Sequence, residues 1–140
     1  MPSPGGNHRV LIVDDEKNIR ESLAAIFTSR GYESKVVFSA EQAVEMIAEW
    51  QPDLAILDVG LPKTNGIDLA IALKTSHPTC RVLLFSGQPS TTGLLADAAA
   101  DVHLFDIMAK PVHPKVLLER AADVLSVNPK ETLKTLGGVN

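Results

Sequence analysis

A short apolar run that ends in a carboxylate constrains the fold of this chain more than any other stretch. Residues 54–57 are four consecutive apolar residues, and Asp58 follows them directly. A run so short and so uniformly apolar is typical of a strand that is covered on both faces of a sheet. The sequence therefore predicts a rigid, buried strand that presents a carboxylate at its C-terminal end.

Four other stretches also predict strands. Residues 9–13 and 81–85 are apolar after their first residue, and residues 104–108 are apolar except for Asp106 and lead into Lys110. Residues 32–38 alternate at first and are more weakly hydrophobic, which indicates an edge strand. The chain therefore predicts one sheet of five strands.

Helices between the strands are predicted by apolar residues that recur every three or four positions. The helical stretches are residues 19–27, 43–48, 67–73, 91–100 and 116–125, and the fourth has only two large apolar residues. Ser39 and Gln42 form a capping-box pattern before the second helix, and Gly31 is a candidate C-cap of the first. Pro114 suits the first turn of the last helix, with His113 in its N-cap region. Strands and helices that alternate in this way predict a parallel sheet covered by helices on both faces.

Charge and hydropathy exclude several classes of partner. The chain has 13 lysines and arginines against 17 aspartates and glutamates, and the net charge of −4 leaves no basic surplus for binding nucleic acid. No stretch approaches the ~20 apolar residues that a membrane span needs. The single cysteine, Cys80, cannot form an internal disulfide and is expected to be a buried, inert thiol. We therefore expect a cytoplasmic protein that binds neither nucleic acid nor membrane.

The length of 140 residues fits one domain of ordinary size. Residues 1–8 are rich in Pro, Gly and Ser and lack the apolar core of a targeting signal, so we expect a flexible leader there. Residues 127–140 contain Pro129, a Gly-Gly pair and few apolar residues, which indicates a tail or a linker stub. The predicted domain is therefore residues 9–126.

Polar residues follow four of the predicted strands at their C-terminal ends. They are Asp14 and Asp15, Asp58, Ser86 and Lys110. In a parallel sheet these ends face one crevice, where the order of the strands reverses. Three carboxylates that converge there repel one another unless a lysine or a divalent cation balances them, and carboxylate oxygens suit Mg²⁺. A nucleophilic carboxylate, a metal site and a fixed positive charge are the parts that phosphoryl transfer needs.

The positions of these residues are similar to the motifs of a known family. The sequence resembles the receiver domain of bacterial two-component response regulators over residues 9–126. The resemblance rests on Asp14-Asp15, on Asp58 with Pro62 and Gly66 four and eight residues later, on Ser86-Gly87 and on Lys110-Pro111. It implies an α/β fold of the flavodoxin-like type, a doubly wound three-layer sandwich around a five-stranded parallel sheet with the strand order 2-1-3-4-5.

The resemblance implies that Asp58 accepts a phosphoryl group from a phosphohistidine on a sensor histidine kinase or a histidine phosphotransfer protein. It also implies a site for Mg²⁺ or Mn²⁺, in which Asp15, Asp58 and the backbone carbonyl of Gly60 bind the ion directly. Asp14 would bind it through water. Lys110 is expected to pair with Asp58 and then with the phosphoryl group. Such a domain catalyses its own phosphorylation and slow dephosphorylation and is not a turnover enzyme.

The resemblance also implies a route for the output. Ser86 is expected to move toward the phosphoryl group, and the movement reaches the face made by the fourth helix, the fifth strand and the fifth helix. The family usually has Tyr or Phe three residues before the lysine, where this chain has Ile107, with Phe105 two residues earlier. The Lys110-Pro111 bond is commonly cis in the family. We expect the signal to reach an unknown downstream protein from a monomer or a weak homodimer.

Other functions remain open at the level of sequence. A phosphatase with an aspartyl-phosphate intermediate would need a second Asp two residues after the nucleophile, where this chain has Gly60. A flavin- or nucleotide-binding protein would need a Gly-rich or Ser/Thr-rich loop where this chain has Asp14, Asp15 and Glu16. A third alternative is a docking module of the same fold that works without phosphorylation. Asp14 and Asp15 are also candidates for capping the first helix instead of binding metal, and Asp15 and Glu16 are candidates for capping it in addition to metal binding.

Overall fold

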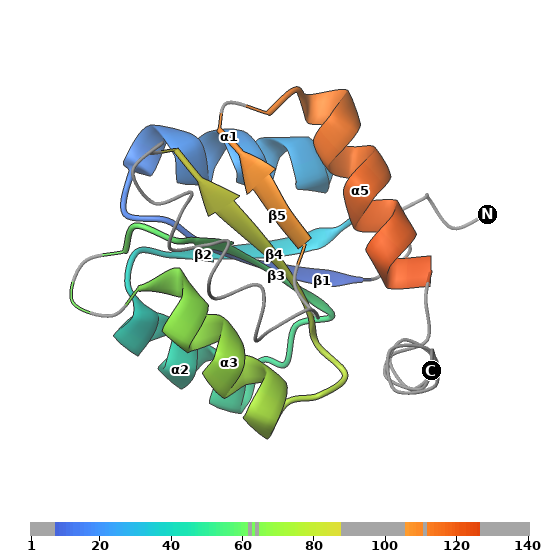
Figure 1. The fold of residues 1–140 in the computed structure, drawn as a ribbon. Helices are drawn as coiled ribbons and strands as arrows, with labels where there is room; N and C mark the ends of the chain where they lie inside the picture. Colours follow the sequence, from blue (N-terminus) through green and yellow to red (C-terminus); the bar gives the residue numbers. More distant parts are fainter. Residues whose placement is uncertain (1–7, 62, 64, 88–105, 111, 127–140) are drawn as a thin grey trace, which may run out of the picture.

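The predicted strands lie in one sheet (Figure 1). The computed structural model describes residues 8–61, 63, 65–87, 106–110 and 112–126. The strands are β1 (Arg9–Val13), β2 (Glu33–Val37), β3 (Leu54–Asp58), β4 (Arg81–Ser86) and β5 (Asp106–Ala109). The helices in the described ranges are α1 (Lys17–Ser29), α2 (Ala40–Glu49), α3 (Gly66–Ser76) and α5 (Pro114–Ser126).

All neighbouring strands of the sheet are parallel, in the order β2-β1-β3-β4-β5. This order confirms the predicted fold class, including the edge position of β2. Because β1 pairs with β2 on one side and with β3 on the other, the order of the strands reverses at β1. Ligands of such sheets bind outside the carboxyl ends of the strands next to the reversal. The residues that follow β1 and β3 therefore occupy the place where this fold binds ligands.

Alternate residues of each strand point to opposite faces of the sheet, and helices cover both faces. In β1, Leu11 and Val13 pack with the apolar residues of α2 and α3, while Val10 and Ile12 pack with those of α1 and α5. Figure 1 shows these two helix pairs on opposite sides of the sheet. All four side chains are fully buried. The apolar run at the start of the chain thus forms a strand that is covered on both faces, as predicted.

The predicted capping residues start the helices, with one difference. Ser39 Oγ accepts a hydrogen bond from the backbone N–H of Gln42 at 3.1 Å. The side chain of Gln42 accepts from the N–H of Phe38 at 2.9 Å rather than from that of Ser39, so the reciprocal bond of the capping box is shifted by one residue. At the start of α5, Nδ1 of His113 accepts from the N–H of Lys115 at 3.1 Å.

Several predictions fall on residues that the structure does not describe. These are the leader apart from His8, the helix at 91–100, the first two residues of the strand at 104–108, and the tail at 127–140. Within the described ranges, no helix is long and apolar enough to cross a membrane. Cys80 is buried as predicted, and burial raises the pKa of its thiol to about 12. Gly31 follows α1 with φ 88°, the left-handed conformation that a C-terminal glycine supplies.

Candidate functional site

Two carboxylates are buried beside each other at the carboxyl ends of β1 and β3. Asp14 follows β1 and Asp58 is the last residue of β3, and the two strands are paired so that Val13 lies opposite Leu57. The exposed fraction is 2% for Asp14 and 7% for Asp58. Because a buried carboxylate is costly without a partner, this pair needs a positive charge and hydrogen-bond donors close by.

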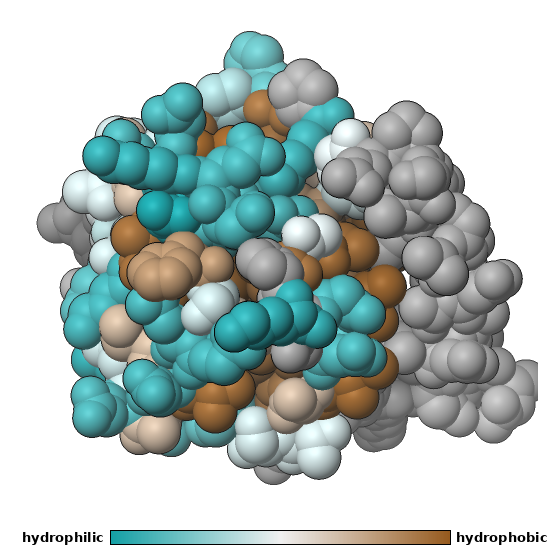
Figure 2. Space-filling view, turned by 90° about the vertical axis from the view of Figure 1, so that its left-hand side faces the viewer, coloured by the Kyte–Doolittle hydropathy of each residue, from teal (hydrophilic) through white to brown (hydrophobic). Residues whose placement is uncertain are grey.

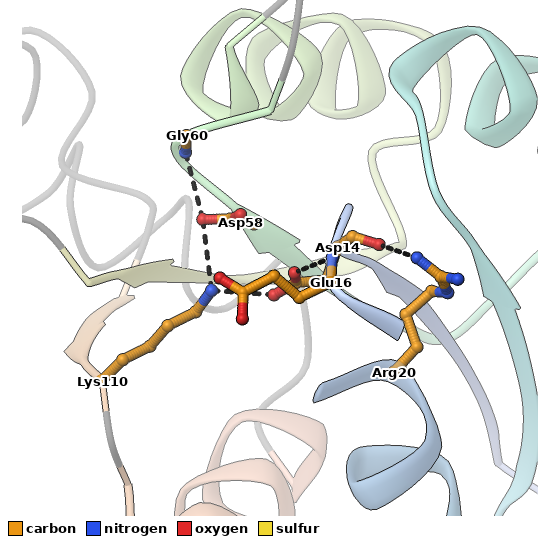
Figure 3. A network of polar contacts seen from close by, with 6 residues as sticks. All are labelled: Asp14, Glu16, Arg20, Asp58, Gly60 and Lys110. Carbon is orange, nitrogen blue, oxygen red and sulfur yellow. Dashed lines mark hydrogen bonds and ion pairs between the residues drawn. The ribbon is translucent and has the colours of Figure 1, made fainter. Parts of the chain in front are cut away.

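Lys110 supplies the positive charge from the end of β5 (Figure 3). Its Nζ lies 2.8 Å from Oδ2 of Asp14 and 3.4 Å from Oδ1 of Asp58. The backbone N–H of Lys110 donates to the carbonyl of Ser86 at 2.9 Å, so the pairing of β4 with β5 fixes where the lysine leaves the sheet. The expected contact with Asp58 is present, but the shorter one is with Asp14.

Two glycines shape the backbone around Asp58. The N–H of Gly60 donates to Oδ1 of Asp58 at 3.1 Å. Gly66 begins α3, and a Cβ at this position would collide with the backbone carbonyl of Asp58. The N–H of Gly66 also donates to the carbonyl of Val59 at 3.1 Å. The first turn of α3 therefore packs directly on the strand end that carries Asp58, and only glycine fits there.

Burial and charge shift the protonation of both Asp58 and Lys110. Burial raises the pKa of the Asp58 carboxyl and the charge of Asp14 raises it further, against the opposing effects of the Gly60 N–H and of Lys110. Burial alone would lower the pKa of Lys110, but the hydrogen bond to Asp14 and the charge of Asp58 outweigh it and raise that pKa. The lysine is therefore a fixed positive charge, whereas the surroundings of Asp58 oppose its ionisation.

Asp14 is held through its backbone and its side chain. Its N–H donates to the carbonyl of Val37 at 3.3 Å, and its carbonyl accepts from Nη1 of Arg20 at 2.8 Å. Oδ1 accepts from the N–H of Glu16 at 2.9 Å, and Oδ2 binds Lys110. Figure 3 shows Arg20 and Lys110 on opposite sides of Asp14. The sequence does not predict the Arg20 contact, because an arginine in a first helical turn looks the same whether it faces solvent or the strand end.

A group of acidic side chains follows β1. Carboxylate oxygens of Asp14, Asp15 and Glu16 lie within 4.8 Å of one another, and Asp15 and Glu16 are exposed. Figure 2 looks onto the left-hand side of Figure 1. Hydrophilic side chains gather over the upper half of this view, on the side of the sheet where α1 lies. Together with Asp58, these carboxylates form a set of hard oxygen donors, so the residues present fit an ion such as Mg²⁺.

The expected cap of α1 by Glu16 is wrong. Glu16 occupies the N-cap position, but its side chain makes no capping hydrogen bond. The Asp14 carboxylate instead accepts from the N–H of Glu16. Asp14, the buried residue and also a candidate cap, is therefore the acidic residue that bonds the backbone at the start of α1.

Of the other predicted site residues, three lie in the described part of the chain and three lie outside it. Ser86 ends β4 and is half-buried, Gly60 is exposed next to Asp58, and Ile107 lies on β5 with an exposed fraction of 37%. The predicted residues Pro62, Phe105 and Pro111 lie outside the described residues. The switch role of Phe105 and the cis bond before Pro111 therefore stay predictions.

A family model for the response regulator receiver domain matches residues 10–122 of this chain. The chain belongs to this family. The matched range runs from β1 into α5 and contains all of the carboxylates and the lysine of the site. The resemblance expected from the sequence is thereby confirmed.

Curated relatives of this receiver domain are response regulators. The chain is 31% identical over 129 residues to the DNA-binding response regulator MtrA of Mycolicibacterium smegmatis, an alignment that covers 91% of this chain and 55% of the relative. It is 32% identical over 119 residues to the response regulator MprA of Mycobacterium ulcerans, covering 84% of this chain and 50% of the relative. This chain thus spans about half the length of the curated relatives it matches.

Solved receiver domains share the fold. The receiver domain of NtrX from Brucella abortus matches with a TM-score of 0.77 and 29% identity, covering 85% of this chain and 99% of that domain. A CheY-like receiver domain protein from Methanospirillum hungatei matches with a TM-score of 0.76 and 28% identity, covering 89% of this chain and 98% of that protein. The chain is therefore a receiver domain of two-component response regulators, in fold as well as in family.

Proposed function

We propose that this receiver domain takes a phosphoryl group onto Asp58 from a phosphohistidine of a sensor histidine kinase or a histidine phosphotransfer protein. The observation that carries the proposal is the asymmetric environment of the Asp58 carboxylate. Its contacts with Gly60 and Lys110 both use Oδ1, so Oδ2 is the oxygen proposed to attack phosphorus. The O–P bond would form as the P–N bond breaks, and the imidazole would keep the electron pair.

Lys110 supports this role through its charge and its anchor. The bond to Asp14 holds Nζ in place, and its raised pKa keeps the ammonium charged. After transfer, the same ammonium is proposed to pair with a phosphoryl oxygen, because the phosphoryl group brings additional negative charge. Ser86, at the end of β4, is proposed to donate its hydroxyl to another phosphoryl oxygen.

The acidic residues are proposed to bind Mg²⁺ or Mn²⁺. Asp15, Asp58 and the carbonyl of Gly60 would hold the ion directly, and Asp14 would hold it through water. Asp15 and Gly60 are exposed, so both are accessible to an ion that arrives from solvent. When bound, the ion would supply positive charge that balances the carboxylates and the phosphoryl oxygens.

The output is proposed to run through protein contact. The signal would pass from Ser86 to Ile107 and Phe105, and from there to an unknown downstream protein. The partial exposure of Ile107 supports a role at the surface. Phosphorylation and slow dephosphorylation would be the domain's own reactions, without turnover of an external substrate. We propose residues 9–126 as the functional unit, acting in the cytoplasm as a monomer or a weak homodimer.

Transfer from a phosphohistidine protein tests this function. Candidate histidine kinases and phosphotransfer proteins, labelled with radioactive phosphate, are mixed with the wild-type chain and with Asp58→Asn in the presence of Mg²⁺. The expected result is label on the wild type and none on the variant. Label that persists on the variant would place the acceptor elsewhere. Steady release of phosphate from a small phosphate ester would indicate a phosphatase instead, and partner binding that ignores phosphorylation would indicate a docking module.

A further inference from the structure

We infer that Arg20, braced against Phe38, is a positioning residue for the phosphoacceptor site. The inference rests on the proposed function, because it names a residue that holds the same site in place. From the first turn of α1, Nη1 of Arg20 donates to the backbone carbonyl of Asp14 at 2.8 Å. Its guanidinium carbon lies 5.7 Å from the centre of the Phe38 ring, which follows β2.

Asp14 is the residue through which Arg20 acts, because Asp14 anchors the lysine of the site. The ammonium of Lys110 lies 2.8 Å from Asp14 but 3.4 Å from Asp58. The position of the ammonium next to Asp58 is therefore set mainly by its shorter contact with Asp14. A shift of the Asp14 peptide would move a carboxylate and the ammonium together, and with them the charge that faces the phosphoacceptor.

The hydrogen bond from Arg20 holds the backbone carbonyl of Asp14 firmly in place. Asp14 lies just beyond the last residue of β1, and its N–H reaches the carbonyl of Val37 only at 3.3 Å. The Arg20 bond is shorter, at 2.8 Å, and its donor is charged, which makes such a bond about twice as strong as a neutral one. Arg20 is half-buried, so water competes for it less than for an exposed side chain.

Phe38 restricts where the guanidinium of Arg20 can lie. A planar guanidinium stacks on an aromatic face while its N–H groups still donate in its own plane, which a lysine ammonium cannot do. The backbone of Phe38 is itself held, since its N–H donates to Gln42 at 2.9 Å. Phe38 is 52% exposed and lies outside the hydrophobic core, so replacement of its ring leaves the core intact. The ends of β1 and β2 are thus connected through one arginine.

Four variants separate positioning from charge. Arg20→Met removes the hydrogen bond and one positive charge, and Arg20→Lys keeps the charge without the planar guanidinium. Phe38→Leu removes the ring and leaves Arg20 in place. Lys17→Met is the matched control, because Lys17 is an exposed cation three residues earlier in α1 whose ion pair with Glu21 lies on the surface.

Phosphorylation by acetyl phosphate with Mg²⁺ measures the effect on the site. Arg20→Met should be phosphorylated about fivefold to tenfold more slowly than wild type, because misplaced reacting groups lose rate steeply. Arg20→Lys and Phe38→Leu should fall between the two, and Lys17→Met should stay close to wild type. If the positive charge of Arg20 only attracted the anionic phosphodonor, Arg20→Met and Lys17→Met would be slowed equally relative to the wild type. In ~0.5 M salt, both variants would then react as fast as the wild type. That result would overturn the inference.

Amide and ammonium NMR spectra, recorded without metal or phosphodonor, supply the readout that does not depend on activity. Arg20→Met should shift the resonances of the Gly60 amide and the Lys110 ammonium, and Lys17→Met should not. Unshifted resonances in a folded Arg20→Met would refute the positioning role whatever the rates. If Arg20→Met does not fold, Arg20→Lys and Phe38→Leu decide in its place. If the wild type takes no phosphoryl group, the proposed function is contradicted. The spectra, which need no phosphodonor, still test whether Arg20 positions the site.

Discussion

Lys110 is anchored to Asp14, with 2.8 Å between Nζ and Oδ2. The side chain of Lys110 is 15% exposed and that of Asp14 is 3% exposed, so water screens this pair weakly. Because Asp58 shares the same ammonium at 3.4 Å, one lysine pairs with both buried carboxylates. The charged groups of the site are therefore assembled before a phosphoryl group arrives.

Lys110→Met is expected to destabilise the protein. Methionine keeps much of the apolar length of the side chain but leaves two buried carboxylates without their cation, which should cost about 3 kcal/mol. Chemical denaturation without Mg²⁺ measures the free energy of unfolding. Lys115→Met, at an exposed lysine in the first turn of α5, is the control and should change it by about 0.5 kcal/mol or less. Equal stability of the two variants would contradict the buried ion pairs.

Asp58→Asn is expected to raise the free energy of unfolding at neutral pH. Burial raises the pKa of Asp58 in the folded state, so the folded protein binds this proton more tightly than the unfolded chain. The stability that this proton contributes is complete below the unfolded-state pKa of about 4 and is lost as the pH rises through the folded-state pKa. Asparagine does not ionise and avoids this loss.

The advantage of Asp58→Asn should therefore be largest at neutral pH and should shrink toward about pH 4. Denaturation midpoints of the two proteins across this range, without metal, measure it. A variant that is less stable than the wild type at neutral pH would show that the charges around Asp58 favour its ionised form instead.

Gly66→Ala is expected to destabilise the protein and to displace Asp58. The added Cβ would collide with the carbonyl of Asp58, and overpacking of this kind costs about 1–3 kcal/mol. Gly60→Ala is the control, because its Cβ would lie at an ordinary 3.7 Å from Oδ1 of Asp58 and should cost about 0.5 kcal/mol or less. Chemical denaturation compares them. If Gly66→Ala is as stable as the wild type, the first turn of α3 does not pack closely against the end of β3 in solution.

Cys80 is expected to react slowly with a disulfide reagent while the protein is folded. Its side chain is buried, with 1% exposed, and burial raises the pKa of the thiol to about 12. Since the thiolate is the reactive form, access and ionisation both oppose the reaction near neutral pH. The rate should rise steeply in denaturant. Reaction of the native protein as fast as in denaturant would place Cys80 at the surface.

The sequence was sufficient to predict the strands and the meeting of the charged residues. Residues 9–13 and 54–57 are apolar at every inner position because both faces of β1 and β3 are buried, so the pattern leaves little choice of structure. The rule that carboxyl ends of parallel strands face one place brought Asp14, Asp58 and Lys110 together, and the structure has them in contact.

The finer contacts could not be predicted, because spacing in the sequence does not distinguish donors and acceptors of similar reach. Lys110 was expected to pair with Asp58 and lies nearer to Asp14. Gln42 bonds Phe38 where Ser39 was expected, and Arg20 bonds a backbone carbonyl that no pattern marks. Each of these choices depends on small differences in backbone position, which only the packed structure defines.

The intact mass of the protein after incubation with acetyl phosphate tests the central claim most directly. The wild-type chain should gain one phosphoryl group in the presence of Mg²⁺ and none when the metal is chelated. Asp58→Asn, which keeps the shape of the side chain but removes the nucleophilic carboxylate, should gain none under either condition. A phosphoryl group on Asp58→Asn, or a wild type that stays unmodified with Mg²⁺, would contradict the assignment of Asp58 as the phosphoacceptor.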